Sequence, residues 1–296
     1  MINDINLIAT LPRLDDKYSI DEIMRCNEIS SVRFNSGVDN LMTASEIVSK
    51  LKELSEFYHK KIWIDLKGRQ LRINAWADPR YDVIELNHDI EVEYPAEIIF
   101  RNSTKANIFR TRKNKITIDR QPQRAVGKGQ SVNIMAKSLL IKGYLTDMDK
   151  QLLIESSKEG LNDYMASFVE SEDDLKEILS FNKQANIISK IESVNGLDFI
   201  NNIDYPLSLM AARDDLYIET KMNKSMLKAL RYIISKDKNA ICASKIFSSL
   251  EKSDIPSLSD YEDIELMLLY GYRNFMIQDD VKGPTLKRII ECFKEF

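Results

Sequence analysis

Short apolar runs rich in β-branched residues alternate with longer amphipathic segments along most of the 296 residues, and this alternation constrains the fold more than any other feature. A strand buried on both faces reads as a short, nearly continuous apolar run, whereas a covering helix shows apolar residues at three- and four-residue spacing. Eight such runs predict the eight strands of one closed (β/α)8 TIM barrel, an α/β architecture that needs roughly 250 residues. The runs are residues 5–11, 30–35, 61–68, 164–169, 186–192, 206–212, 240–246 and 273–278.

The segments between these runs predict the covering helices and one insertion. Residues 74–144 lack long helical periodicity and carry short β-like pieces, so we predict a small β lid domain inserted after the third strand. The predicted organisation is therefore barrel over 1–73, lid over 74–144 and barrel again over 145–296. One predicted helix has an apolar stripe that we expect to pack against the barrel. The stripe consists of Met226, Leu227, Leu230, Ile233 and Ile234.

Composition excludes several classes of protein. No apolar run approaches the roughly 20 residues that cross a bilayer, and the N-terminal stretch lacks a basic leader and a cleavage site, so we expect a cytoplasmic protein. Three scattered cysteines build no disulfide framework, and two histidines cannot build a multi-histidine zinc site. With a net charge of −4 we expect neither a nucleic-acid nor a membrane partner. Carboxylates, lysine, arginine and a hard metal ion remain as the means of catalysis.

Polar residues at the ends of the predicted strands are the candidates for chemistry, because active sites in such barrels lie at the C-terminal ends of the strands. Glu192 and Asp215 supply two carboxylates from neighbouring strand ends, which predicts a site for Mg²⁺ or Mn²⁺. Lys190 shares one side of the extended strand with Glu192 and brings a cation to a metal-bound anion. Arg33 and Arg72 carry forked donors that suit a phosphate or carboxylate.

Several segments resemble, in the same order and over nearly the whole chain, motifs of the pyruvate kinase family. KIWIDLKGRQLRI is similar to the D-T-K-G-P-E-I-R strand that precedes that family's lid domain, and LTDMDKQLL to L-T-E-K-D. GLNDYMASFVESEDDLKEI resembles the strand and helix of A-S-F-V-R, and IISKIESVNGLDFI resembles I-I-x-K-I-E-N-x-x-G. AARDDLYIE is similar to A-R-G-D-L-G-V-E, and CASKIFSSL to A-T-Q-M-L-E-S. The resemblance implies a barrel with an inserted lid, and we expect the family's C-terminal domain to be absent.

The resemblance implies a catalytic role for four residues. Lys190 would stabilise the charge on a transferring phosphoryl group and on the enolate of pyruvate. Arg33 and Arg72 would contact the phosphate. Ser244 stands where the family has threonine and keeps a hydroxyl at the reaction centre, beside the substrate.

The resemblance also implies binding sites for substrate and metal ions. Glu192 and Asp215 would hold the divalent ion, and the backbone amides near Asp214 and Asp215, at a helix start, would bind the substrate carboxylate. Positions that bind a monovalent cation in the family are matched here, which implies a K⁺ site. These positions are Asn35, Ser36 and Asp65.

The chain departs from the family's motifs mainly on the potassium and nucleotide side. Arg69 and Gln70 replace a proline and a glutamate, which argues against dependence on K⁺. The loop after Arg33 is two residues shorter and lacks histidine, and residues 276–282 read MIQDDVK where the family has M-L-S-G-E-T-A. We therefore expect activity with ADP to be weak or absent, and the sequence does not identify the acceptor.

The pattern predicts chemistry on phosphoenolpyruvate, pyruvate or a related 2-oxo acid with an unidentified second substrate. The leading hypothesis is a magnesium-dependent, pyruvate-kinase-like phosphotransferase, because Lys190 and the arginines suit a phosphoryl group. A metal-dependent lyase or aldolase that acts through a pyruvate enolate needs the same carboxylates but fewer phosphate contacts. A non-catalytic barrel that binds a metabolite is the third hypothesis. The sequence is compatible with a homo-oligomer and does not determine the oligomeric state.

Overall fold

A computed structural model describes residues 4–37, 42–74, 83–100, 104–120, 127–136, 138–220, 225–279 and 281–296. The chain divides into two compact units. The first consists of the described residues up to Ser36, those from residue 42 to Leu66, and Gln151–Phe296. The second contains Lys67–Lys150 and also Gly37, whereas the sequence led us to expect an insertion over 74–144.

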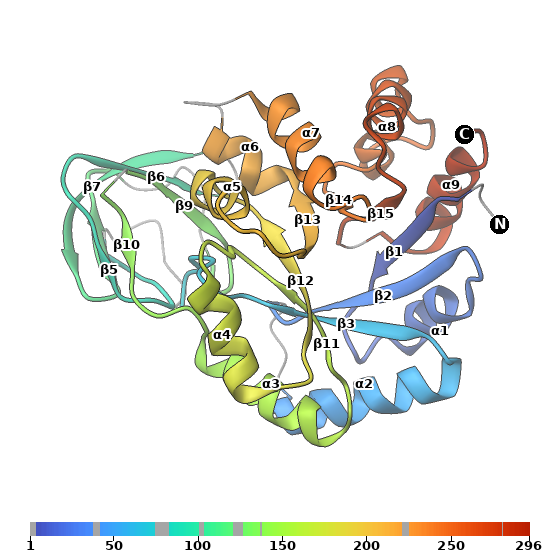
Figure 1. Cartoon of the computed structure of the whole chain (residues 1–296), viewed down its shortest axis with the longest axis horizontal. Coiled ribbons are helices and arrows are strands. Elements are labelled where there is room, and N and C mark those ends of the chain that lie inside the picture. Colours follow the sequence, from blue (N-terminus) through green and yellow to red (C-terminus); the bar gives the residue numbers. More distant parts are fainter. Residues whose placement is uncertain are drawn as a thin grey trace. The chain divides into compact units, whose positions relative to one another are not determined.

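The first unit is a closed barrel of eight parallel strands, in the order β1-β15-β14-β13-β12-β11-β3-β2 (Figure 1). Each strand lies within or beside one of the eight apolar runs, so the prediction of a TIM barrel is confirmed. The strands are β1 (Asn6–Thr10), β2 (Ile29–Asn35), β3 (Lys61–Leu66), β11 (Asp163–Ala166), β12 (Asn186–Ile191), β13 (Ser208–Ala212), β14 (Ile241–Ala243) and β15 (Asn274–Met276).

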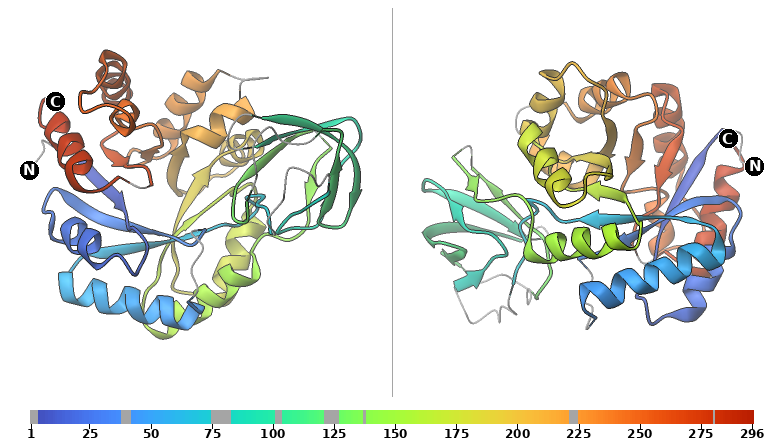
Figure 2. Two further views of the ribbon diagram at one scale, coloured as in Figure 1. Left: turned by 180° about the vertical axis from the view of Figure 1, so that it is seen from behind. Right: turned by 60° about the horizontal axis from the view of Figure 1, so that its bottom comes forward.

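Helices follow the strands and cover the outside of the barrel (Figures 1 and 2). Side-chain caps mark several of their starts: Thr43 and Ser257 each form a capping box, and Ser193 accepts from the Gly196 amide. The helices are α1 (Lys17–Arg25), α2 (Ala44–Tyr58), α3 (Asp147–Lys158), α4 (Glu172–Phe181), α5 (Val194–Asn201), α6 (Arg213–Thr220), α7 (Met226–Lys236), α8 (Leu258–Tyr270) and α9 (Gly283–Phe293), with a 3₁₀ turn, η1, at Ser248–Glu251.

The predicted apolar stripe lies on α7, but not all of it is buried. Leu230, Ile233 and Ile234 are buried, whereas Leu227 is 44% exposed, so its assignment to the core was wrong. Ala229 is buried in the first turns of the helix instead. Among the described residues, no helix is both long enough and apolar enough to cross a membrane.

The barrel interior consists of an apolar cluster with a polar layer next to it. Residues from seven of the strands form the cluster: Ile8, Trp63, Met165, Ile188, Met210, Ile241, Ala243 and Met276. Because successive side chains point to opposite faces of a strand, the residue two positions further along shares the inward face and lies nearer the C-terminal end. This residue is polar after Ile8, Trp63, Met165 and Ile188. Together with Arg33 of β2, these four residues define the polar layer: Thr10, Arg33, Asp65, Ser167 and Lys190.

The second unit is a small β domain, drawn in teal and green in Figure 2. An antiparallel sheet in the order β4-β8-β7-β6-β9 and a β10-β5 pair enclose a core of aliphatic residues and Phe100. The strands are β4 (Val83–Glu85), β5 (Ile90–Glu91), β6 (Ala96–Phe100), β7 (Lys105–Arg112), β8 (Lys115–Ile118), β9 (Val132–Met135) and β10 (Leu140–Ile141). The β domain that the sequence predicts after the third strand is therefore present.

Candidate active site

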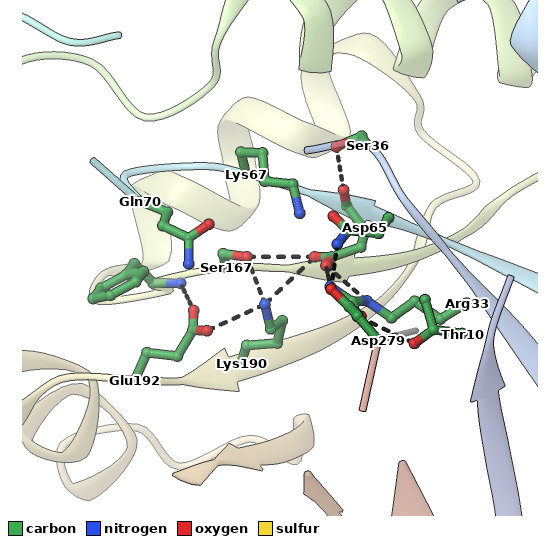
Figure 3. A network of polar contacts seen from close by, with 12 residues as sticks. Thr10, Arg33, Ser36, Asp65, Lys67, Gln70, Ser167, Lys190, Glu192 and Asp279 are labelled. Carbon is green, nitrogen blue, oxygen red and sulfur yellow. Dashed lines mark hydrogen bonds and ion pairs between the residues drawn. The ribbon is translucent and has the colours of Figure 1, made fainter. Parts of the chain in front are cut away.

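Lys190 lies at the centre of the polar layer (Figure 3). Its Nζ atom donates to Ser167 Oγ at 2.7 Å and to Asp65 Oδ1 at 3.4 Å, and it lies 3.1 Å from Glu192 Oε1. Burial lowers the pKa of Lys190, but the charges of Asp65 and Glu192 outweigh burial and raise the pKa above its usual value. The side chain is therefore a permanent cation at the C-terminal end of β12.

Asp65 joins the two cations of the layer. Its Oδ2 atom accepts from Arg33 Nε at 2.8 Å and also from Arg33 Nη2, while its Oδ1 atom accepts from Lys190 and Ser167. The Asp65 side chain is fully buried and that of Arg33 is 9% exposed. A buried carboxylate that binds two cations holds them in fixed positions. The sequence assigned Asp65 to a K⁺ site, and the geometry gives it this role as well.

Asp279, which follows β15, binds the other side of Arg33 (Figure 3). Its Oδ1 atom accepts from Arg33 Nη1 at 2.5 Å, and its Oδ2 atom accepts from Asn35 Nδ2 at 2.7 Å. Thr10 Oγ1 accepts from the same Nη1 atom at 3.3 Å. Ser36 donates from its hydroxyl to the Asp65 carbonyl oxygen at 2.6 Å, so the three residues predicted for K⁺ lie close together.

Glu192 and Asp215 have the electrostatics of a cation site. Glu192 is buried and its Oε2 atom accepts from the Phe168 amide at 2.7 Å. Burial raises the pKa of Glu192 to about 7; Lys190 opposes the rise and the charge of Asp215 adds to it. Two carboxylates that repel each other are suited to bind a cation between them. Mg²⁺ needs only one or two protein carboxylates, because waters and substrate oxygens complete its coordination. Among the described residues there is no group of three or more His, Cys, Asp or Glu side chains that would hold a metal ion by itself.

A further carboxylate, Glu219, lies near both Asp215 and Glu170. Burial, together with the charges of Glu170 and Asp215, raises the pKa of Glu219 on α6 to about 7. Glu170 accepts a hydrogen bond from Ser193 Oγ. Sequence reasoning gave no role to either glutamate, although Glu170 directly follows the predicted strand over 164–169. Glu219 lies a full turn beyond Asp215 on α6, so only the helix geometry reveals its place.

Asp214 and Ser244 flank the start of α6. Asp214 is exposed in the first turn, and its carboxylate lies 3.6 Å from Lys245 Nζ. Ser244 follows β14 with a φ of 71°, a left-handed conformation that is costly for a residue other than glycine. The carbonyl oxygen of Ser244 accepts from two nitrogens of Arg213, and Arg213 binds Asp263 on α8 at 2.7 and 2.8 Å. This buried arginine holds the turn in which Ser244 lies.

Arg72 belongs to the second unit, whereas Arg33 belongs to the barrel. Its Nε atom donates to Gln70 Oε1 at 2.8 Å and its Nη1 atom donates to the Gly129 carbonyl oxygen at 2.5 Å. A phosphate clamp made by Arg33 and Arg72 remains a prediction.

Sequence reasoning gave no role to two residues of the site. Ser167 accepts from Lys190 and donates to Asp65, and its position directly after β11 is a signal that was present in the sequence. Gln278 lies two positions beyond Met276, on the inward side of β15. Within the described part of the chain, its amide nitrogen and oxygen are buried and form no hydrogen bond.

Comparison with known proteins gives matches to pyruvate kinases. A family model described as the barrel domain of pyruvate kinase matches residues 103–283. A pyruvate kinase of Thermoplasma acidophilum is 23% identical over 299 residues, which are 93% of this chain and 54% of that protein. A pyruvate kinase of Debaryomyces hansenii is 23% identical over 324 residues, 95% of this chain and 63% of that protein. One of Dictyostelium discoideum is 35% identical over 115 residues, 36% of this chain and 22% of that protein. The chain thus spans about half to two thirds of the length of the relatives that match most of it.

Proposed function

Since the chain belongs to the pyruvate kinase family, we propose that it is a phosphotransferase acting on phosphoenolpyruvate and pyruvate, with an acceptor that need not be ADP. The observation that carries the proposal is the position of Lys190, which is buried at the end of β12 between Asp65, Ser167 and Glu192. A fixed cation at this place stabilises negative charge that develops on a phosphoryl group or an enolate.

The neighbouring residues supply orientation. Asp65 and Ser167 hold Lys190, so that its charge needs no rearrangement when negative charge develops. The backbone amides in the first turn of α6 would bind a substrate carboxylate, as helix N-termini bind anions. Arg213 binds the carbonyl oxygen of Ser244 and so holds the turn that would present the Ser244 hydroxyl to the same site.

Glu192 and Asp215 would hold a divalent cation, Mg²⁺ or Mn²⁺. Such an ion, when bound, neutralises charge on the oxygens of an enolate or phosphoryl group. It would also relieve the repulsion between the two carboxylates, which the raised pKa of Glu192 reflects. The proposed K⁺ site at Asn35, Ser36 and Asp65 is a weaker fit, because two protein cations, Arg33 and Lys190, already bind the Asp65 carboxylate.

Turnover of phosphoenolpyruvate tests the proposal. Pyruvate release should be measured with Mg²⁺ and a panel of acceptors that includes ADP, other nucleoside diphosphates and alcohols, and ³¹P NMR identifies the phosphorylated product. We expect transfer to one class of acceptor and a fall in kcat of about 10²-fold or more in Lys190→Met. An exposed variant, Lys176→Met, is the control. Absence of pyruvate release with every acceptor, together with no Mg²⁺-dependent binding of oxalate, would overturn the proposal.

A metal-dependent lyase acting through a pyruvate enolate is the second candidate. The observation in its favour is that Arg33 is already bound by two carboxylates, Asp65 and Asp279, which leaves fewer positive groups for a phosphate. Pyruvate formation from oxaloacetate, compared with and without Mg²⁺ and corrected for the reaction of the free ion, separates this activity from phosphoryl transfer.

A further inference from the structure

Arg33 contacts one carboxylate on each side. Asp65 is fully buried behind it, whereas the Asp279 side chain is 36% exposed. A ligand that enters from solvent therefore meets Asp279 before it meets the guanidinium group. The contact joins residues 246 positions apart, at the ends of β2 and β15, and it depends on closure of the barrel.

The carboxylate of Asp279 spans the two donors that a bound anion would use. One oxygen lies 2.5 Å from Arg33 Nη1 and the other lies 2.7 Å from Asn35 Nδ2. Phosphoryl oxygens bind arginine and amide donors with the same geometry and spacing. A phosphoryl group can reach Arg33 and Asn35 only if the carboxylate moves away.

The charges of the surrounding residues lead to the same conclusion. Two cations, Arg33 and Lys190, are bound by three carboxylates, Asp65, Glu192 and Asp279. A phosphoryl dianion must compete with Asp279 for Arg33, whereas a substrate carboxylate bound at the start of α6 does not need Arg33. We infer that Asp279 is a specificity-determining residue that favours unphosphorylated 2-oxo acids over the phosphorylated enol; this inference rests on the proposed function, since it concerns the substrate of the same site.

Binding of two probes to Asp279 variants tests the inference. Dissociation constants of phosphoenolpyruvate and of oxalate, each with Mg²⁺, should be measured by calorimetry for the wild type, Asp279→Asn and Asp279→Ala. We expect phosphoenolpyruvate to bind about tenfold more tightly or better in both variants, because a close negative charge is lost. Oxalate, which carries no phosphoryl group, should change by less than about threefold.

Asp163→Asn is the matched control, since it removes one negative charge at the start of β11, where Asp163 pairs with Lys61 at 2.8 Å. It should alter neither constant. Equal gains for both probes, or unchanged or weaker binding of phosphoenolpyruvate while oxalate still binds, would overturn the role of Asp279 and leave the proposed function standing. If neither probe binds any variant in the presence of Mg²⁺, the proposed function fails, and this inference fails with it.

Discussion

Lys190 Nζ lies 3.1 Å from Glu192 Oε1, and the two side chains are 7% and 2% exposed. They occupy positions i and i+2 at the end of β12, so they share the inward face of the strand. Burial of both charges is costly, and the pair is tolerable because Asp65 and Ser167 satisfy the remaining protons of the ammonium group. The energetics of this pair and its neighbours lead to four predictions.

Lys190→Met should strongly destabilise the protein, because it leaves Asp65 and Glu192 as buried carboxylates without their shared cation. We expect the free energy of unfolding to fall by about 3–5 kcal/mol at pH 8, measured by urea denaturation. Lys176→Met, which removes only exposed pairs on α4, should cost less than about 1 kcal/mol. A cost for Lys190→Met as small as that of the control would contradict the buried ion-pair network.

Asp215→Asn should make the metal-free protein more stable and Mg²⁺ less effective. The substitution removes a charge that raises the pKa of Glu192 and of Glu219, so we expect a gain of about 1 kcal/mol without metal. The increase in Tm on addition of Mg²⁺ should largely disappear. Asp173→Asn, in the first turn of α4 and 90% exposed, should retain the full increase. If Mg²⁺ raises the Tm of Asp215→Asn as much as that of the wild type, Asp215 is ruled out as a ligand.

Glu219 should make stability fall as pH rises. Burial raises its pKa from 4.5 to about 7, so the folded state binds a proton that the unfolded state releases between these values. The contribution of this proton to the free energy of unfolding is complete below pH 4.5 and is lost as pH rises through 7. Glu219→Gln should remove this loss, which is of order 3 kcal/mol at most, as urea denaturation at pH 5 and pH 8 would measure. The exposed Glu265→Gln should keep the wild-type pH profile, and an identical profile in Glu219→Gln would contradict the assignment.

Gln278→Met should stabilise the ligand-free protein. Both polar atoms of the amide are buried without a hydrogen-bond partner among the described residues, and each such group costs about 1–3 kcal/mol. Methionine has a similar length and carries no such groups. A rise in the urea midpoint, with weaker binding of oxalate, would indicate that the amide is reserved for a ligand. A lower midpoint would show that the amide is satisfied in the folded protein.

The architecture could be predicted because each element is encoded by neighbouring residues. The runs that became β1, β12 and β15 are short, apolar and flanked by amphipathic segments, and burial on both faces of a parallel sheet requires that pattern. The spacing of Lys190 and Glu192 likewise places both side chains on one face by local geometry alone. Leu227 was misassigned because helical spacing defines a stripe but not its edge, and Ala229 covers the barrel side of that turn instead.

The barrel, the inserted β domain and the strand ends that carry polar side chains could be predicted from the sequence alone, because they follow from periodicities of two and of about 3.6 residues. The contacts between these side chains depend on the tertiary fold. The pairing of Arg33 with Asp279 and the binding of Lys190 by Asp65 join strands that are far apart in the chain. Such contacts depend on the register between neighbouring strands around the closed barrel. The hydrophobic pattern of a single strand does not specify this register.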